Sequence, residues 1–165
     1  MKFSSIKEYF YKLYNVCYIV TLVPLGVFIY LYMKLQAIEI NTIIKDPKEI
    51  LIAQVILFVI VAGVLTSVHL VINKKMKGLS KKFGLGDKMD GYYSLSITRI
   101  LVGALTSLIA GGGLLLTGSE VFSVYFLLIL LWMAYHWPIP KRMCVELRLK
   151  GDEKEMILYK RESLN

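Results

Sequence analysis

The fold is decided by residues 46–77, which read DPKEILIAQVILFVIVAGVLTSVHLVINKKMK. Asp46 can cap a helix, Pro47 fits the first helical position, and Glu49 completes a capping box. Residues 50–72 then contain no Asp, Glu, Lys or Arg. At ~1.5 Å per residue this run is long enough to cross a ~30 Å hydrocarbon core. The segment therefore predicts a membrane-spanning helix.

Three further apolar runs predict three more spans, at about residues 14–33, 97–117 and 121–137. The chain is 56% hydrophobic with a mean hydropathy of +0.59, above the ~45–50% apolar content typical of soluble domains. Pro24 should kink the first span, and two prolines after residue 137 should stop the last. We expect an all-α integral membrane protein: one domain, an antiparallel bundle of four transmembrane helices, with a short tail over residues 138–165.

The basic residues indicate the orientation of these spans. The segment before the first span holds three Lys and Arg residues, the connection between spans two and three holds seven when Arg99 at the start of span three is included, and the tail holds seven. The other two connections hold three and none. By the positive-inside rule both termini and the middle connection are cytoplasmic. The Ile- and Lys-rich composition and the small size favour the cytoplasmic membrane of a bacterium.

A net charge of +8 raises the question of a nucleic-acid partner. We predict anionic lipid headgroups instead, because the cations gather where apolar runs end. The expected headgroup contacts lie at the inner ends of spans two, three and four: His69, Lys74, Lys75, Arg99, His136, Lys141 and Arg142. Two other interpretations stay open for the histidines and Arg99. They can simply snorkel to the interface, or the two imidazoles can ligate a haem.

Several shorter patterns predict how the segments begin and connect. Ser5 should cap the first helix, whose face of Phe3, Ile6, Phe10 and Leu13 could lie on the headgroups. The glycines of residues 74–96 disfavour a continuous helix and favour a segment that follows the bilayer surface. Ser119 should cap span four. Residues 152–159 favour a final helix after a break at Gly151, although residues 145–149 alternate as a strand would.

Small residues on span three predict a helix-packing seam formed by Gly103, Ser107, Gly111 and Gly118. Such spacing allows a second helix backbone to come close in lipid. The seam can face its own bundle, with Gly63 and Ser67 as the opposing small face, or it can face a partner. A local unwinding at Gly111, Gly112 and Gly113 is a further possibility, because Gly costs about 1 kcal/mol in a helix relative to Ala.

No catalytic motif is present in the sequence, and it predicts no cofactor and no metal. Cys17 and Cys144 fall on the reducing side, so a disulfide is not expected. The function that fits is a small non-catalytic accessory or structural subunit of a larger membrane complex, with lipids and other membrane subunits as partners. The first alternative is a homo-oligomeric channel or carrier with a polar path at Gln54, Thr106 and Ser107. The second is a lipid- or haem-handling membrane enzyme.

Overall fold

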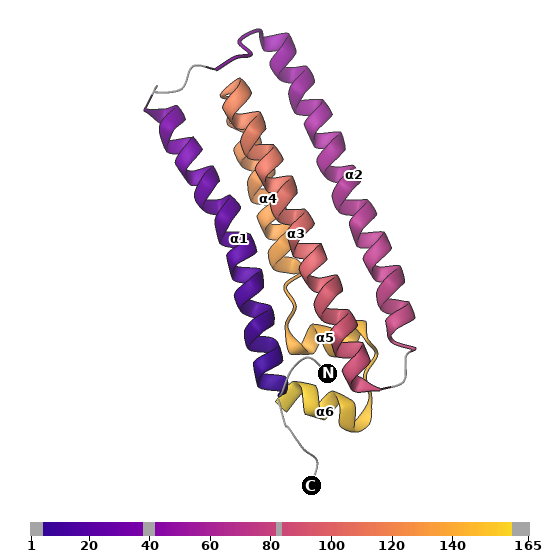
Figure 1. Ribbon diagram of the computed structural model, residues 1–165. Coiled ribbons are helices and arrows are strands. Elements are labelled where there is room, and N and C mark those ends of the chain that lie inside the picture. Colours follow the sequence, from indigo (N-terminus) through magenta and orange to yellow (C-terminus); the bar gives the residue numbers. More distant parts are fainter. Residues whose placement is uncertain (1–4, 38–41, 82–83, 160–165) are drawn as a thin grey trace.

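The computed structural model describes residues 5–37, 42–81 and 84–159, and all regular structure within them is helical. Four long helices run up and down beside one another, and two short ones lie at one end (Figure 1). Their bounds are α1 Ile6–Gln36, α2 Pro47–Leu79, α3 Leu85–Thr117, α4 Val121–Tyr135, α5 Pro140–Glu146 and α6 Gly151–Tyr159. The expected all-α antiparallel bundle is confirmed.

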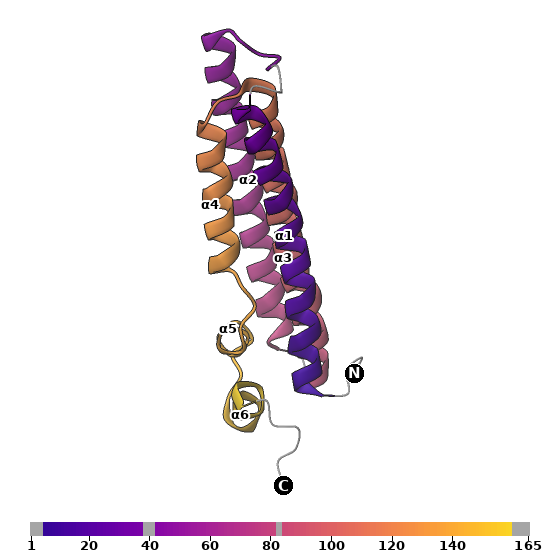
Figure 2. The ribbon, with the colours of Figure 1, turned by 90° about the vertical axis from the view of Figure 1, so that its left-hand side faces the viewer.

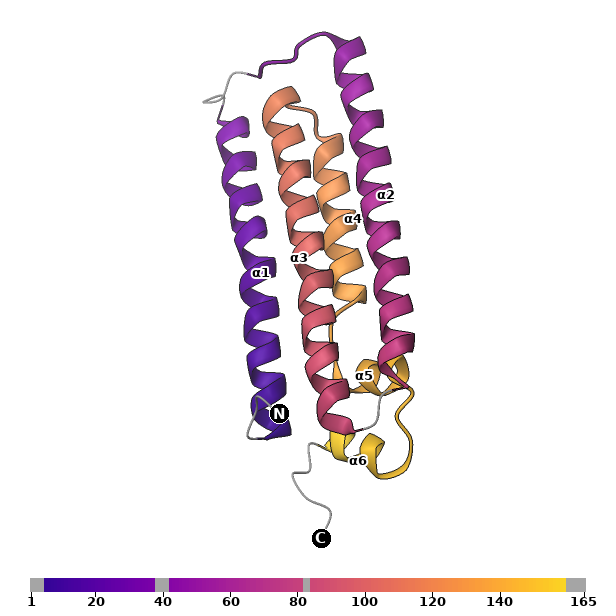
Figure 3. The same ribbon diagram turned by 45° about the vertical axis from the view of Figure 1, so that its right-hand side comes forward.

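Helix α3 is the centre of the bundle. It packs against α1, α2 and α4, and α1 and α2 lie on its opposite sides (Figure 1). Figure 2 shows α4 on one side of the bundle with α5 and α6 beyond its end, and in Figure 3 α4 lies between α3 and α2. In its most apolar window α3 is 56% buried, against 17% for α1 and 11% for α2. The outer helices thus leave most of their apolar surface uncovered.

Within the described residues three helices, α1, α2 and α3, are long and apolar enough to cross a membrane. Helix α4 has only 15 residues, and it forms a fourth candidate only together with α5, from which it is bent by 77°. The expected span over residues 121–137 is therefore shorter as a helix than predicted. His136 is the C-cap of α4, and α5 begins in a new direction at Pro140. One helix does not run through this segment, because proline cannot donate the backbone hydrogen bond that a continuing helix needs.

The helix ends confirm two predicted caps and correct a third. Ser5 Oγ accepts a hydrogen bond from the Glu8 backbone N–H at 3.1 Å, and Asp46 Oδ1 accepts one from the Lys48 N–H at 3.0 Å. Ser119 does not cap α4: the N-cap is Glu120, without a side-chain bond. The Ser119 hydroxyl instead accepts a hydrogen bond from another helix.

The connection between α2 and α3 is more helical than predicted. Helix α2 continues to Leu79 and α3 already begins at Leu85, so most of the segment expected to follow the bilayer surface is helix. Gly91 explains part of the difference, because a Cβ there would lie 2.5 Å from Leu79 Cδ1. Its missing side chain lets α3 pack tightly on the end of α2, and this packing outweighs the low helix propensity of glycine.

The start of α1 was expected to lie on the lipid headgroups, but in the structure this face is buried in the bundle. Ile6, Phe10 and Leu13 belong to the core, while Phe3 lies outside the described residues. The Tyr9 hydroxyl donates to the Met89 carbonyl on α3 at 2.9 Å. Helix α1 is one continuous helix through Pro24.

Candidate functional site

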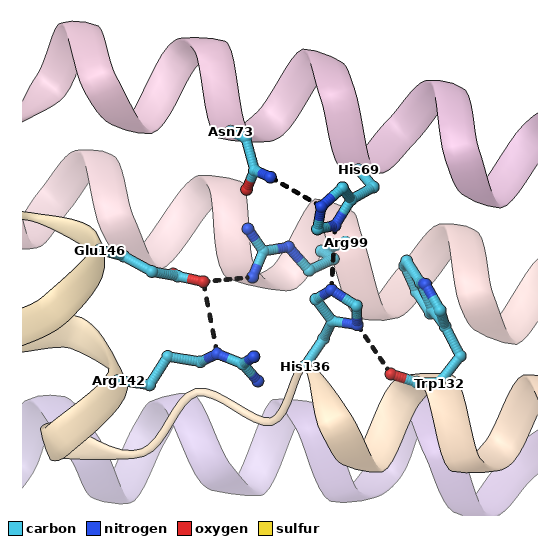
Figure 4. A network of polar contacts seen from close by, with 7 residues as sticks. All are labelled: His69, Asn73, Arg99, Trp132, His136, Arg142 and Glu146. Carbon is cyan, nitrogen blue, oxygen red and sulfur yellow. Dashed lines mark hydrogen bonds and ion pairs between the residues drawn. The ribbon is translucent and has the colours of Figure 1, made fainter.

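Two histidines meet at the end of the bundle where α5 and α6 lie. His69 on α2 and His136 at the end of α4 place Nδ1 and Nε2 3.1 Å apart (Figure 4). Asn73 Nδ2 lies 2.8 Å from His69 Nε2, and His136 Nδ1 lies 2.8 Å from the Trp132 carbonyl oxygen. The sequence predicted a similar depth for the two imidazoles, and the structure brings them into direct contact.

The hydrogen-bond chain has one consistent arrangement for neutral imidazoles. The Trp132 carbonyl only accepts, so His136 Nδ1 carries the proton and its Nε2 accepts. His69 Nδ1 then donates to His136, and His69 Nε2 accepts from the Asn73 amide. Every ring nitrogen has a partner without any added charge. Haem ligation would need the iron between the rings, in the space where they are hydrogen-bonded directly.

A buried ion pair lies beside the histidines. Arg99 on α3 is 1% exposed, and its Nη1 is 2.9 Å from Glu146 Oε1 on α5. Arg142 Nε lies 3.4 Å from the same oxygen, and its guanidinium sits 4.7 Å from the centre of the Tyr135 ring. Figure 4 shows both arginines directed at Glu146. This carboxylate therefore ties the short helix α5 to the centre of the bundle.

The ion pair is incompletely satisfied by protein atoms. Arg99 Nε and Nη2, Glu146 Oε2 and the Tyr92 hydroxyl are buried without a hydrogen-bond partner. Buried charges are costly unless they are paired, so Arg99 depends strongly on the single bond to Glu146. Sequence reasoning did not single out Glu146. The available signal was the four-residue spacing from Arg142 to Glu146, which places opposite charges on one helix face.

The predicted headgroup contacts fall into two groups. Arg99 and His136 are buried inside the bundle, and His69 and Arg142 are half-buried in the same cluster. Snorkelling, the simplest interpretation of the histidines and Arg99, does not fit Arg99, whose partner is a protein carboxylate. Lys74, Lys75 and Lys141 are exposed, and their contact with lipid stays a prediction.

The predicted seam on α3 lies inside the bundle. A Cβ at Gly103 would meet Met133 Cγ of α4 at 2.6 Å, and one at Gly111 would meet Phe28 of α1 at 3.6 Å. Gly118 adopts the left-handed conformation with φ 66°, ending α3 close to the outer connection. Ser107 is fully buried, and its hydroxyl donates to the Ala104 carbonyl at 2.7 Å. Of the two alternatives, the structure supports packing within the chain.

Two details of the seam prediction are wrong. Gly63 and Ser67 do not form the opposing small face, because both are exposed and a Cβ at Gly63 would have no neighbour within 4 Å. Helix α3 also runs without interruption through Gly113, so no unwinding occurs there. A Cβ at Gly113 would lie 2.6 Å from the Phe122 ring, which shows why a glycine is needed: α4 packs directly on this position.

The polar side chains proposed as a pore path are engaged within the protein. Gln54 Nε2 donates to the Ser119 hydroxyl at 2.7 Å. Thr106 donates to the Val102 carbonyl at 2.7 Å. The first bond ties α2 to the turn between α3 and α4, and the second stays within α3, so both brace the bundle.

The cysteines are both buried, free thiols. Burial raises the pKa of the Cys144 thiol in the tail, which lowers its thiolate fraction and its reactivity. Within the described ranges no three His, Cys, Asp or Glu side chains gather as a metal site. In comparisons with protein-family models, curated proteins and solved structures, nothing matches this chain, so its function is argued from this geometry.

Proposed function

We propose that the chain is a non-catalytic accessory subunit of a larger membrane assembly in a bacterial cytoplasmic membrane. It has four spans, the last formed by α4 and the turn that follows it, and both termini face the cytoplasm. The orientation rests on the distribution of basic residues between the connections. The candidate site then lies at the cytoplasmic end, where it fixes α5 to the bundle.

The observation that carries this proposal is the uncovered surface of α2. Only 11% of its most apolar window is buried, and along most of its length a narrow stripe packs on the core through Ala53, Leu57, Val61, Leu65 and Val68. Large apolar side chains cover the rest, among them Leu51, Val55, Ile56 and Val59. A helix held by one stripe leaves room for a partner helix to pack alongside. The interior of the bundle, in contrast, is braced by its own hydrogen bonds.

Site-specific crosslinking tests this role. A photoreactive amino acid at Val55 or Val59, which are 55% and 63% exposed, should capture a defined second subunit in the native membrane. The matched control is Leu57, which faces the core and should give no intermolecular product. The same subunit should copurify in constant ratio after extraction into polymer-bounded discs. Products containing only this chain would favour the homo-oligomeric pore, a Soret band in the purified protein would favour haem handling, and products with lipid alone would contradict the accessory role.

A further inference from the structure

A pocket of about 410 Å³ lies between α5 and α6. Its apolar lining includes Val145, Leu149 and Leu158, and its charged lining consists of three cations, Lys141, Arg148 and Lys154. Among the residues that the structure describes, no carboxylate lines it. The pocket thus combines an apolar surface with positive charge. An amphiphile that has an apolar part and an anionic group would match both features.

Two carboxylates of α5 and α6 form ion pairs with cations outside the pocket. Glu146 is engaged by Arg99 and Arg142, and Glu153 is engaged by Lys88 at 2.8 Å. Lys141, Arg148 and Lys154 are exposed, and in the part of the chain that the structure describes no carboxylate pairs with them. Glu146 and Glu153 are thus engaged by other cations, and the pocket keeps the charge of its own three.

The backbone at Arg148 provides an independent observation. Helix α5 ends in a Schellman motif, in which Leu149 N–H donates to the Cys144 carbonyl and Arg148 N–H donates to the Val145 carbonyl. The residue after the C-cap in this motif is left-handed and is usually glycine. Here it is Arg148, with φ 52°. An arginine at a position that favours glycine indicates that its side chain has a role.

The pocket also lies where a lipid headgroup would be. Helix α5 follows α4 at the inner end of the bundle and is turned by 77° from it. It therefore runs roughly perpendicular to the long helices, and so nearly parallel to the surface of a membrane that they span (Figure 2). Under the proposed orientation this is the cytoplasmic leaflet, which is rich in anionic lipids.

We infer that this pocket binds one membrane lipid with an anionic phosphate headgroup. Lys141, Arg148 and Lys154 hold the phosphate, and the lipid's apolar part contacts Val145 and Leu158. Of these three cations, only Lys141 is among the headgroup contacts predicted from the sequence. The assignment to the cytoplasmic leaflet rests on the proposed orientation. Lipid binding in detergent tests the pocket alone, so a lack of binding would refute the lipid site and leave the topology of the spans unaffected.

Lipid titration distinguishes a specific site from general charge attraction. Dioctanoylphosphatidylglycerol is added to the full chain in neutral maltoside micelles, and native mass spectrometry counts the bound molecules. We expect saturable binding of one molecule, much tighter than that of dioctanoylphosphatidylcholine. Because each cation near an anionic headgroup changes affinity by about fivefold, the triple variant Lys141→Gln, Arg148→Asn, Lys154→Gln should bind on the order of 100-fold more weakly. Asn suits the left-handed backbone at position 148, so the fold should be retained, which circular dichroism checks.

The matched control removes three exposed cations that do not line the pocket, by Lys77→Gln, Lys81→Gln and Lys150→Gln. It should weaken binding by less than about fivefold. Equal losses in the two triple variants would overturn the inference, as would inorganic phosphate competing as well as the lipid. A chain that ends at residue 159 tests whether residues 160–165 occupy the pocket. Unchanged lipid affinity after this truncation supports the lipid site. Lipid binding that appears only after the truncation would assign the pocket to these residues.

Discussion

Glu146→Gln should destabilise the protein strongly, because it leaves the charge of Arg99 without a counterion inside the bundle. The Arg99 side chain is 2% exposed, and two of its nitrogens already lack a partner among protein atoms. Removing one member of a buried ion pair typically costs 3–5 kcal/mol. Since Gln can still accept one hydrogen bond from Arg99, we expect the lower end, about 3 kcal/mol, or roughly a 100-fold change in the unfolding equilibrium.

The control for this substitution is Glu153→Gln in the pair with Lys88. There the side chains are 35% and 12% exposed, so water screens the pair and the expected cost is below about 1 kcal/mol. Unfolding by dodecyl sulfate in mild detergent can be followed by tryptophan fluorescence, because Trp132 lies beside His136 in the cluster. The double variant Arg99→Met, Glu146→Leu should recover most of the loss, since apolar replacements of buried pairs are often neutral. Equal costs for Glu146→Gln and Glu153→Gln would refute the reasoning.

Three other predictions follow from the packing. Gly113→Ala should destabilise by ~1–3 kcal/mol, because its Cβ would lie 2.6 Å from the Phe122 ring, whereas Gly112→Ala, with nothing within 4 Å, should stabilise by up to about 1 kcal/mol; equal melting shifts would contradict the seam. A double-mutant cycle of Gln54→Ala and Ser119→Ala should give a coupling of about 0.6–1.7 kcal/mol, and no coupling would mean that the bond does not persist in lipid. In a Cys17→Ser background, Cys144 should react slowly with iodoacetamide at pH 8 and quickly after unfolding, because its raised pKa leaves less thiolate at that pH; fast labelling of the folded protein would contradict its burial.

The features that depend on local chemistry could be predicted from the sequence. Asp46 caps α2 because its carboxylate reaches a free N–H two residues ahead, and residues 50–72 are apolar enough to be recognised without any partner. The glycine strip of α3 was found by its spacing, which reflects one helix face. In each case the causal contacts lie within a turn or two of the residue itself.

The features that depend on long-range contacts could not be predicted in this way. The glycines of residues 74–96 predict a break in the helix because glycine has a low helix propensity. In the structure Gly91 lies within α3, where its missing side chain allows close packing on Leu79, and this packing outweighs the low propensity. Ser119 looked like a cap, but its hydroxyl is bonded to Gln54, which is distant in sequence. The pairing of Arg99 with Glu146 similarly requires α5 to lie under the bundle. The prolines after residue 137 predict that α4 ends, but they do not specify the direction in which α5 continues.

The most direct test of the central claim is the sidedness of four single cysteines, introduced in place of Lys45, Lys81, Glu120 and Lys150 in a chain without native cysteines. A membrane-impermeant maleimide is applied to intact cells and, separately, to permeabilised cells. The account predicts labelling of positions 45 and 120 in intact cells, and of positions 81 and 150 only after permeabilisation. Labelling of position 150 from outside would show that α4 does not cross the membrane, and would contradict both the four-span topology and a cytoplasmic site.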